Sequence, residues 1–190
     1  MNNQEQILRD TLNRFNVLDD AEFYKFINIC EFRQYPKKGY LLKAGQYNKG
    51  ICFVLSGTVG LYRLNDGKKI YENFFLKTDF ANELDSLVSQ APTTKNLFAI
   101  TNVECFFIKR DALIGLYEDS IAFERLGRKI LEHILNERTK ISSMLISLKP
   151  EEKYRYIEKY RPGFIREVPL INLASYLGLA RETLSRIRGK

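Results

Sequence analysis

The sequence predicts an α+β protein: an N-terminal β jelly roll with flanking helices, a long helix, and a C-terminal helical domain. Two observations support this class. From residue 34 to about residue 110, glycines separate short runs of β-branched and aromatic residues. After Asp111 the hydrophobic period becomes 3.6 residues, which is typical of helices. With 190 residues the chain can form one or two domains.

Residues 3–29 are predicted to form two short helices that flank the jelly roll. Asp19-Asp20 lies between them at a position suited to helix capping. Their apolar faces contain Ile7, Leu8, Leu12 and Phe15 in the first helix and Phe23, Phe26 and Ile27 in the second.

Strands are predicted at residues 51–55, 58–64, 69–75, 96–100 and 104–108. The first two are separated by Ser56-Gly57, and Asn65-Asp66-Gly67 is a strong hairpin signal between the second and third. Many short strands with regular turns indicate a double-sheet sandwich or jelly roll.

A single apolar stripe predicts one helix from about residue 120 to residue 148. Glu137 interrupts the stripe, and Lys149-Pro150 ends it before a helix at residues 151–160. The stripe can pack along its own domain or form a two-fold dimer seam, and we favour the seam. The residues assigned to this dimer interface are Phe123, Leu126, Ile130, Ile134, Ile141 and Met144.

The C-terminus contains two short helical stripes separated by Gly178, the pattern of a helix-turn-helix. The first stripe contains Leu170, Leu173, Ala174 and Leu177, and the second contains Ala180, Leu184 and Ile187. The opposite face of the second stripe carries Arg181, Glu182, Ser185 and Arg186. Arginine pairs with guanine and glutamate accepts from cytosine in the major groove, so this face is suited to DNA. The alternative is a solvated charged face.

The distribution of charge agrees with a DNA-binding C-terminus. The formal net charge is +7, and residues 149–190 hold ten Lys/Arg and five Asp/Glu, so they account for +5 of it. No signal peptide or membrane span is recognisable, and we expect a cytoplasmic protein without a membrane partner. The three cysteines, Cys30, Cys52 and Cys105, lack metal or disulfide spacing.

Enzyme motifs are missing from the sequence. The single histidine, His133, cannot by itself complete a zinc or facial-triad site, so no metal site is predicted. There is neither a G-x-S-x-G elbow nor a G-x-x-x-x-G-K-[ST] phosphate loop. We therefore expect a protein that is not an enzyme.

The glycine-rich jelly roll, the long helix and the terminal helix-turn-helix resemble the Crp–Fnr superfamily of bacterial transcription regulators. The resemblance rests on Lys38-Gly39, Gly45, the run from Phe53 to Tyr62, and the segment from Ala174 to Ile187. The overall residue pattern is similar to that of the subgroup found in Bacteroidetes. The resemblance implies a cyclic-nucleotide-binding-like effector domain at 1–118, a dimerisation helix at 119–148 and a DNA-binding domain at 149–190.

The resemblance also implies partners and site residues. A homodimer would bind near-palindromic double-stranded DNA with half-sites ~34 Å apart, and RNA polymerase is a further partner of such regulators. Because the sequence ends two residues after Arg188, we expect the β-hairpin wing of the family to be absent. Arg181, Glu182 and Arg186 would read bases, Thr183 and Ser185 would position phosphates, and Arg188 completes the DNA-binding set.

The effector pocket implied by the resemblance departs from that of cyclic-nucleotide sensors. Those proteins begin a phosphate-binding helix with Phe-Gly-Glu-Leu and place an arginine about ten residues later. Here the glycine is absent, Thr93-Thr94 stands in place of the arginine, and Asp85 adds negative charge. Lys95 offers only a point charge, so we expect no tight binding of cAMP or cGMP.

Two interpretations of this pocket stay open. It holds an unidentified, less anionic small-molecule effector, or its own Phe and Leu side chains fill it. No cofactor is assigned. The alternative function is a regulatory module that acts through protein contacts without reading DNA. The residues assigned to the effector pocket are Phe80, Glu83, Leu84, Thr93, Thr94, Lys95 and Thr139.

Overall fold

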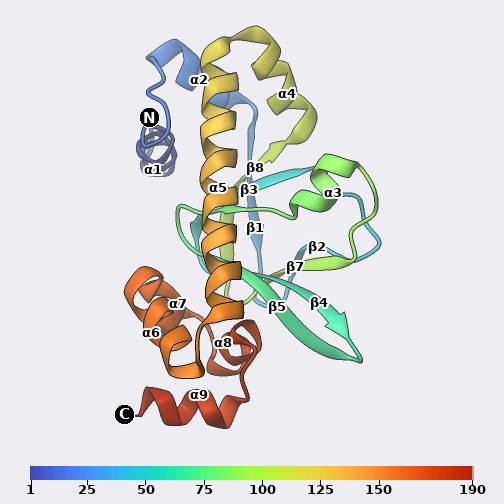
Figure 1. Cartoon of the computed structure of the whole chain (residues 1–190). Helices are drawn as coiled ribbons and strands as arrows, with labels where there is room; N and C mark the ends of the chain where they lie inside the picture. The colour runs from blue at the N-terminus through green and yellow to red at the C-terminus, as the bar shows by residue number, and fades with distance from the viewer. Residues whose placement is uncertain (190) are drawn as a thin grey trace.

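The computed structural model describes residues 1–189 and contains an N-terminal β-sandwich joined by one long helix to a group of C-terminal helices (Figure 1). The chain begins with α1 (Asn3–Leu12) and α2 (Asp20–Asn28), which lie beside the upper end of the long helix. Asn2 and Asp19 cap these helices through capping boxes with Glu5 and Glu22. The predicted capping role of Asp19 is confirmed.

Two four-stranded antiparallel sheets form the sandwich, and the predicted jelly roll is confirmed. One sheet has the strand order β1-β8-β3-β6 and the other has the order β2-β7-β4-β5. Short β-branched and aromatic runs form these strands because alternate side chains face the space between the sheets. The strands are β1 (Cys30–Tyr35), β2 (Tyr40–Leu42), β3 (Gly50–Ser56), β4 (Val59–Asn65), β5 (Lys68–Phe75), β6 (Phe80–Ala81), β7 (Lys95–Ala99) and β8 (Val103–Lys109).

Two tight turns have the conformation that their residues favour. Asp66 and Gly67 both have positive φ, 49° and 75°, as a two-residue hairpin between β4 and β5 requires. Gly57 has φ 85°, and a Cβ there would collide with the carbonyl oxygen of Asn102. The sequence did not predict β1, β2 or β6.

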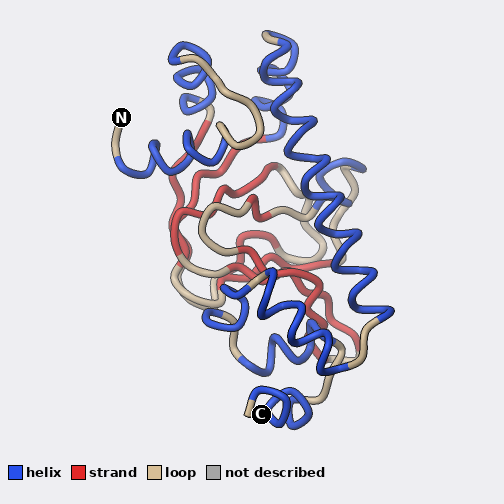
Figure 2. Tube along the Cα trace, turned by 60° about the vertical axis from the view of Figure 1, so that its left-hand side comes forward, coloured by secondary structure: helices blue, strands red, loops and turns tan. Residues whose placement is uncertain are grey.

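Helices cover the ends of the sandwich. The short α3 (Leu84–Ser89) follows β6, and α4 (Arg110–Asp119) follows β8. Ser120 is extended and caps α5 (Ile121–Ser147), the long predicted helix. With 27 residues, α5 is about 40 Å long at ~1.5 Å per residue and passes from the N-terminal helices to the C-terminal ones (Figure 2).

The dimer interface predicted from the α5 stripe requires a correction. Phe123, Leu126 and Met144 are between 1% and 3% exposed within a single chain. Phe123 and Leu126 pack against the sandwich and the N-terminal helices, and Met144 packs among the C-terminal helices. These three side chains cannot contact a second subunit, because their own chain already covers them. Ile130, Ile134 and Ile141 are half-buried.

Four helices form the C-terminal part: α6 (Pro150–Tyr160), α7 (Pro162–Glu167), α8 (Leu170–Leu177) and α9 (Arg181–Arg188). Proline begins both α6 and α7, where its missing N–H costs nothing. The helices share a core that contains Ile157, Phe164, Leu173, Ala174, Leu177 and Leu184. In the described part of the chain, no helix is long and apolar enough to cross a membrane.

Candidate nucleic-acid interface and effector cleft

The two terminal helices, α8 and α9, form the predicted helix-turn-helix. Gly178 ends α8 in the left-handed conformation with φ 66°, which glycine adopts without strain. The N–H of Leu179 donates to the carbonyl of Ala174 at 2.9 Å and closes the turn. Ala174 is buried between the helices, where its small side chain allows a close crossing. Gly178 therefore separates the two helices, as the sequence predicts.

The recognition-like helix α9 has one anchored face and one exposed face. Leu184 is fully buried and Ile187 packs against the same core, whereas Ala180 is an exposed N-terminal cap, not part of the apolar face as the stripe predicted. Thr183 is half-buried. The exposed face carries Arg181, Glu182, Ser185, Arg186 and Arg188.

The charged side chains of α9 lie exposed at the surface of the described part of the chain. Among residues 1–189, Arg181, Glu182, Arg186 and Arg188 form no ion pair within 4.0 Å. A helix of eight residues does not hold together alone in water, so the contacts of Leu184 and Ile187 fix its orientation. The exposed face of α9 therefore holds four charged side chains and a serine toward solvent in a fixed orientation.

The carboxylate of Glu83, which was predicted to contact an effector, caps its own helix. Glu83 is buried and accepts from the backbone N–H groups of Asp85 and Ser86 at 3.2 and 3.0 Å. Asn48 holds the segment in place by donating its side-chain amide to the carbonyl of Glu83 at 2.9 Å. Both carboxylate oxygens of Glu83 therefore already accept hydrogen bonds.

Lys95, which the sequence assigns to the effector pocket, lies among three carboxylates. Its Nζ is 2.6 Å from Asp85, 3.2 Å from Glu72 and 3.6 Å from Glu83. The hydrogen bond from Lys95 lowers the pKa of Asp85, which keeps that carboxyl ionised. An entering phosphate would meet this negative charge, and Lys95 is already neutralised.

The remaining predicted pocket residues do not form one site. Thr93 is buried and its hydroxyl accepts from the N–H of Lys95 at 3.0 Å, while Thr94 is exposed. Leu84 is half-buried at the start of α3. Thr139 is exposed and donates its hydroxyl to the carbonyl of Leu135 within α5. The structure brings Glu83 and Lys95 together, but both side chains are already engaged by other groups of the same chain.

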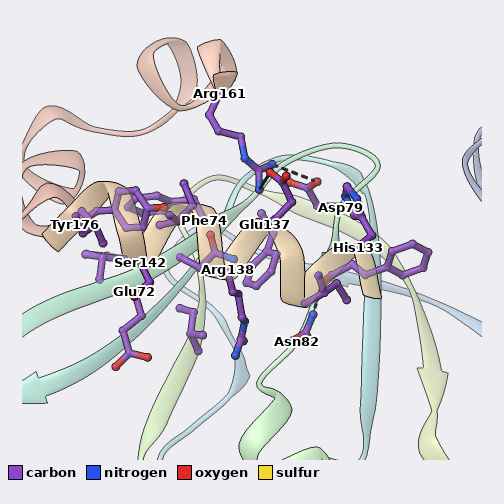
Figure 3. A pocket seen from close by; sticks show the side chains of 18 of the residues that line it. Glu72, Phe74, Asp79, Asn82, His133, Glu137, Arg138, Ser142, Arg161 and Tyr176 are labelled. Carbon is purple, nitrogen blue, oxygen red and sulfur yellow. Dashed lines mark hydrogen bonds and ion pairs between the residues drawn. The ribbon is translucent and has the colours of Figure 1, made fainter. Parts of the chain in front are cut away.

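A cleft of about 970 Å³ lies between β5, the segment 78–82, α5 and α8 (Figure 3). Of the predicted effector-pocket residues, Phe80 lines it and the other six do not. Among the residues that line the cleft, sequence reasoning had not assigned Asp79, Asn82 or Tyr176 to any site. Glu137, which interrupts the apolar stripe of α5, is the sequence signal that could have located the cleft.

A three-residue polar cluster links the C-terminal helices to α5 and the sandwich at this cleft. Arg161 reaches from the α6–α7 junction toward Asp79 and Glu137, with N–O distances of 4.0 and 3.8 Å (Figure 3). Asp79 also accepts from the N–H of Leu76 at 2.9 Å. Burial raises the pKa of the Asp79 carboxyl. Glu137, the polar residue within the apolar stripe, thus faces Arg161 at 3.8 Å and also pairs with Lys140 at 3.1 Å.

Comparison with known proteins identifies one domain by sequence. Residues 32–120 match the family model of the cyclic nucleotide-binding domain. No curated protein sequence matches the chain.

Solved structures share the fold of nearly the whole chain. FixK2 from Bradyrhizobium japonicum has a TM-score of 0.71 at 18% identity, covering 85% of this chain and 83% of FixK2. The catabolite activator protein of Thermus thermophilus has a TM-score of 0.59 at 20% identity, covering 94% and 85%. A protein from Eubacterium rectale, described as a Crp/Fnr family regulator, has a TM-score of 0.68 at 12% identity, covering 90% and 82%.

Proposed function

We propose that this chain, which has the fold of the Crp–Fnr regulators and contains a cyclic nucleotide-binding domain, is a dimeric DNA-binding transcription regulator. One observation carries the proposal. Within residues 1–189, the helix α9 presents Arg181, Glu182 and Arg186 to solvent without ion pairs, while Leu184 fixes its other face to the core. Exposed, oriented and unpaired charges are what base readout requires.

In this proposal α9 enters the major groove. Arg181 and Arg186 donate to guanine, and Glu182 accepts from the amino group of cytosine, so each half-site contains G·C pairs. Ser185 and the half-buried Thr183 contact phosphates from the edge of the helix. Each base contact contributes about 1–3 kcal/mol of discrimination.

The dimer forms through a second apolar stripe on α5, opposite the buried one. Leu131, Leu135 and Ile146 are 44% to 82% exposed. With ~100° per residue, these three side chains fall within one face about 60° wide, and the buried Phe123, Leu126 and Met144 fall on the other side of the helix. Burial of this exposed stripe against its two-fold copy would place two α9 helices on one side of the dimer.

DNA reading is tested by selecting binding sites from a random duplex library with the full chain. The proposal expects an enriched near-palindrome with G·C pairs in each half-site. Arg186→Ala then weakens binding to the selected site by about 1–3 kcal/mol, a loss of roughly 5- to 150-fold. Arg125→Ala, at an exposed position on α5 far from α9, removes the same charge and serves as the control. Equal losses in the two variants, or no enrichment, would favour the protein-interaction module instead.

The dimer is tested by light scattering at micromolar concentration. Leu135→Asp places a charge in the proposed seam, so we expect a monomer and weaker operator binding. Val88→Asp makes the same kind of change at an exposed valine of α3 and leaves the dimer intact. A wild-type chain that is monomeric at these concentrations, or a dimer that survives Leu135→Asp, contradicts the proposed seam.

A further inference from the structure

The cleft between β5, α5 and α8 shares only Phe80 with the predicted effector pocket. Glu83, Thr93, Thr94 and Lys95, which correspond to the ligand-holding segment of the family, do not line it. Its walls come from the sandwich, the long helix and the helix-turn-helix, so it contacts all three parts of the chain (Figure 3). About 970 Å³ is at the upper end of the volumes typical of small-molecule sites.

Two buried polar side chains that line this cleft lack a partner for one atom each. Asn82 is 1% exposed; its amide donates to the carbonyl of Phe80, but its Oδ1 accepts no hydrogen bond. Tyr176 is 3% exposed, and its hydroxyl has no partner. Buried polar atoms in native proteins are nearly always paired, and leaving one unpaired is costly. Both atoms therefore point to a molecule that supplies the missing hydrogen bonds.

The walls of the cleft indicate the kind of molecule. Phe74, Ile141 and Leu145 supply apolar surface to the cleft. Four Lys/Arg and three Asp/Glu side chains line the cleft, so their charges nearly balance. Arg161, whose charge acts on the hydroxyl of Tyr176, already faces Asp79 and Glu137. A charged ligand placed beside Tyr176 would lose its hydration and meet an arginine that already faces two carboxylates.

We propose that this cleft binds an uncharged small molecule with a flat apolar body and an amide-like head. The apolar body lies against Phe74 and Ile141. The ligand offers a donor to Asn82 Oδ1 and forms a hydrogen bond with the hydroxyl of Tyr176. Because Tyr176 belongs to α8, occupancy fixes the helix-turn-helix relative to α5 and β5. This regulatory consequence rests on the proposed DNA-binding function, whereas the binding itself does not.

The test uses three isosteric fragments: neutral benzamide, anionic benzoate and cationic benzamidinium. Each is titrated into the ¹⁵N-labelled full chain, and amide shifts are followed by NMR. We expect benzamide to shift the amides of Phe74, Ser142 and Tyr176 and to bind at least about threefold more tightly than either ion. No shift at these amides, or equal binding of all three fragments, overturns the proposal.

Tyr176→Phe supplies the second arm. It removes only the unpartnered hydroxyl, so the variant folds with an unchanged or higher Tm, while benzamide binds about two- to tenfold more weakly. Tyr117→Phe removes a hydroxyl from a half-buried tyrosine outside the cleft and leaves the affinity unchanged. Benzamide binding that is insensitive to Tyr176→Phe overturns the assigned anchor. Neither arm measures DNA binding, so a failure here is distinguishable from a failure of the proposed function.

Discussion

Phe74 on β5 lies where the sandwich meets the C-terminal helices, and its replacement should loosen that contact selectively. Its ring centroid is 5.0 Å from Tyr71 in the same strand and 5.5 Å from both Phe164 on α7 and Tyr176 on α8. Two of its three aromatic neighbours therefore belong to the C-terminal helices. We expect Phe74→Leu to weaken the attachment of these helices more than it weakens the sandwich.

The size of the effect follows from what leucine keeps and what it loses. Leucine retains most of the apolar burial at this site, where Phe74 is almost fully buried. It loses two aromatic pairs across the contact, each contributing about 0.5–1.5 kcal/mol. The local opening free energy of α7 and α8 should fall by about 1–3 kcal/mol, which corresponds to amide exchange roughly 5- to 150-fold faster.

Hydrogen exchange followed by mass spectrometry measures this opening segment by segment. Peptides from α7 and α8 should exchange faster in Phe74→Leu, while peptides from β3 and β8 should change little. Phe53→Leu is the matched control, because Phe53 is fully buried and its ring neighbour is Phe80 within the sandwich. If α7 and α8 exchange at the wild-type rate in Phe74→Leu, or if both variants accelerate the same peptides, the contact does not attach the helices as argued.

Two further predictions concern stability. Leu184→Ala leaves a cavity beneath α9 and should lower the free energy of unfolding by about 2–5 kcal/mol in urea titrations, weakening DNA binding although Leu184 faces away from the reading surface. Unchanged stability would show that α9 is not anchored there. Burial raises the folded-state pKa of Asp79, so its contribution to stability is full below the unfolded-state pKa, about 3.9, and is lost as pH rises through the folded-state pKa. Asp79→Asn should remove this loss of stability at higher pH. An identical pH profile of unfolding in the variant and the wild type would contradict the prediction.

Local signals predicted the elements that depend on local chemistry. The hairpin at Asn65-Asp66-Gly67 is set by two residues with positive φ, and the helix-turn-helix is set by Gly178 and flanking stripes. The short strands β2 and β6 went unpredicted because two or three residues carry too little pattern. They are strands because a neighbour already in the sheet pairs with them.

The partner of a buried face could not be predicted in the same way. The α5 stripe correctly indicates that Phe123, Leu126 and Met144 are covered, but periodicity does not reveal whether the same chain or a second one covers them. These three residues were therefore assigned to a dimer seam although they pack within the chain. The cleft was missed for a related reason, since Asn82 and Tyr176 are far apart in sequence and come to line one cleft only through tertiary packing.

The attachment of α8 to the edge of a sheet explains how the cleft and α9 can be coupled. β5 is the terminal strand of its sheet, so one side of its backbone has no neighbouring strand. Ser175 of α8 takes the place of that neighbour: its hydroxyl accepts from the N–H of Tyr71 at 3.2 Å and donates to the carbonyl of Lys69 at 2.8 Å. The next residue, Tyr176, lines the cleft. A molecule that moves β5 or α5 at the cleft therefore moves α8, and α9 follows because Gly178 and Leu184 join the two helices closely.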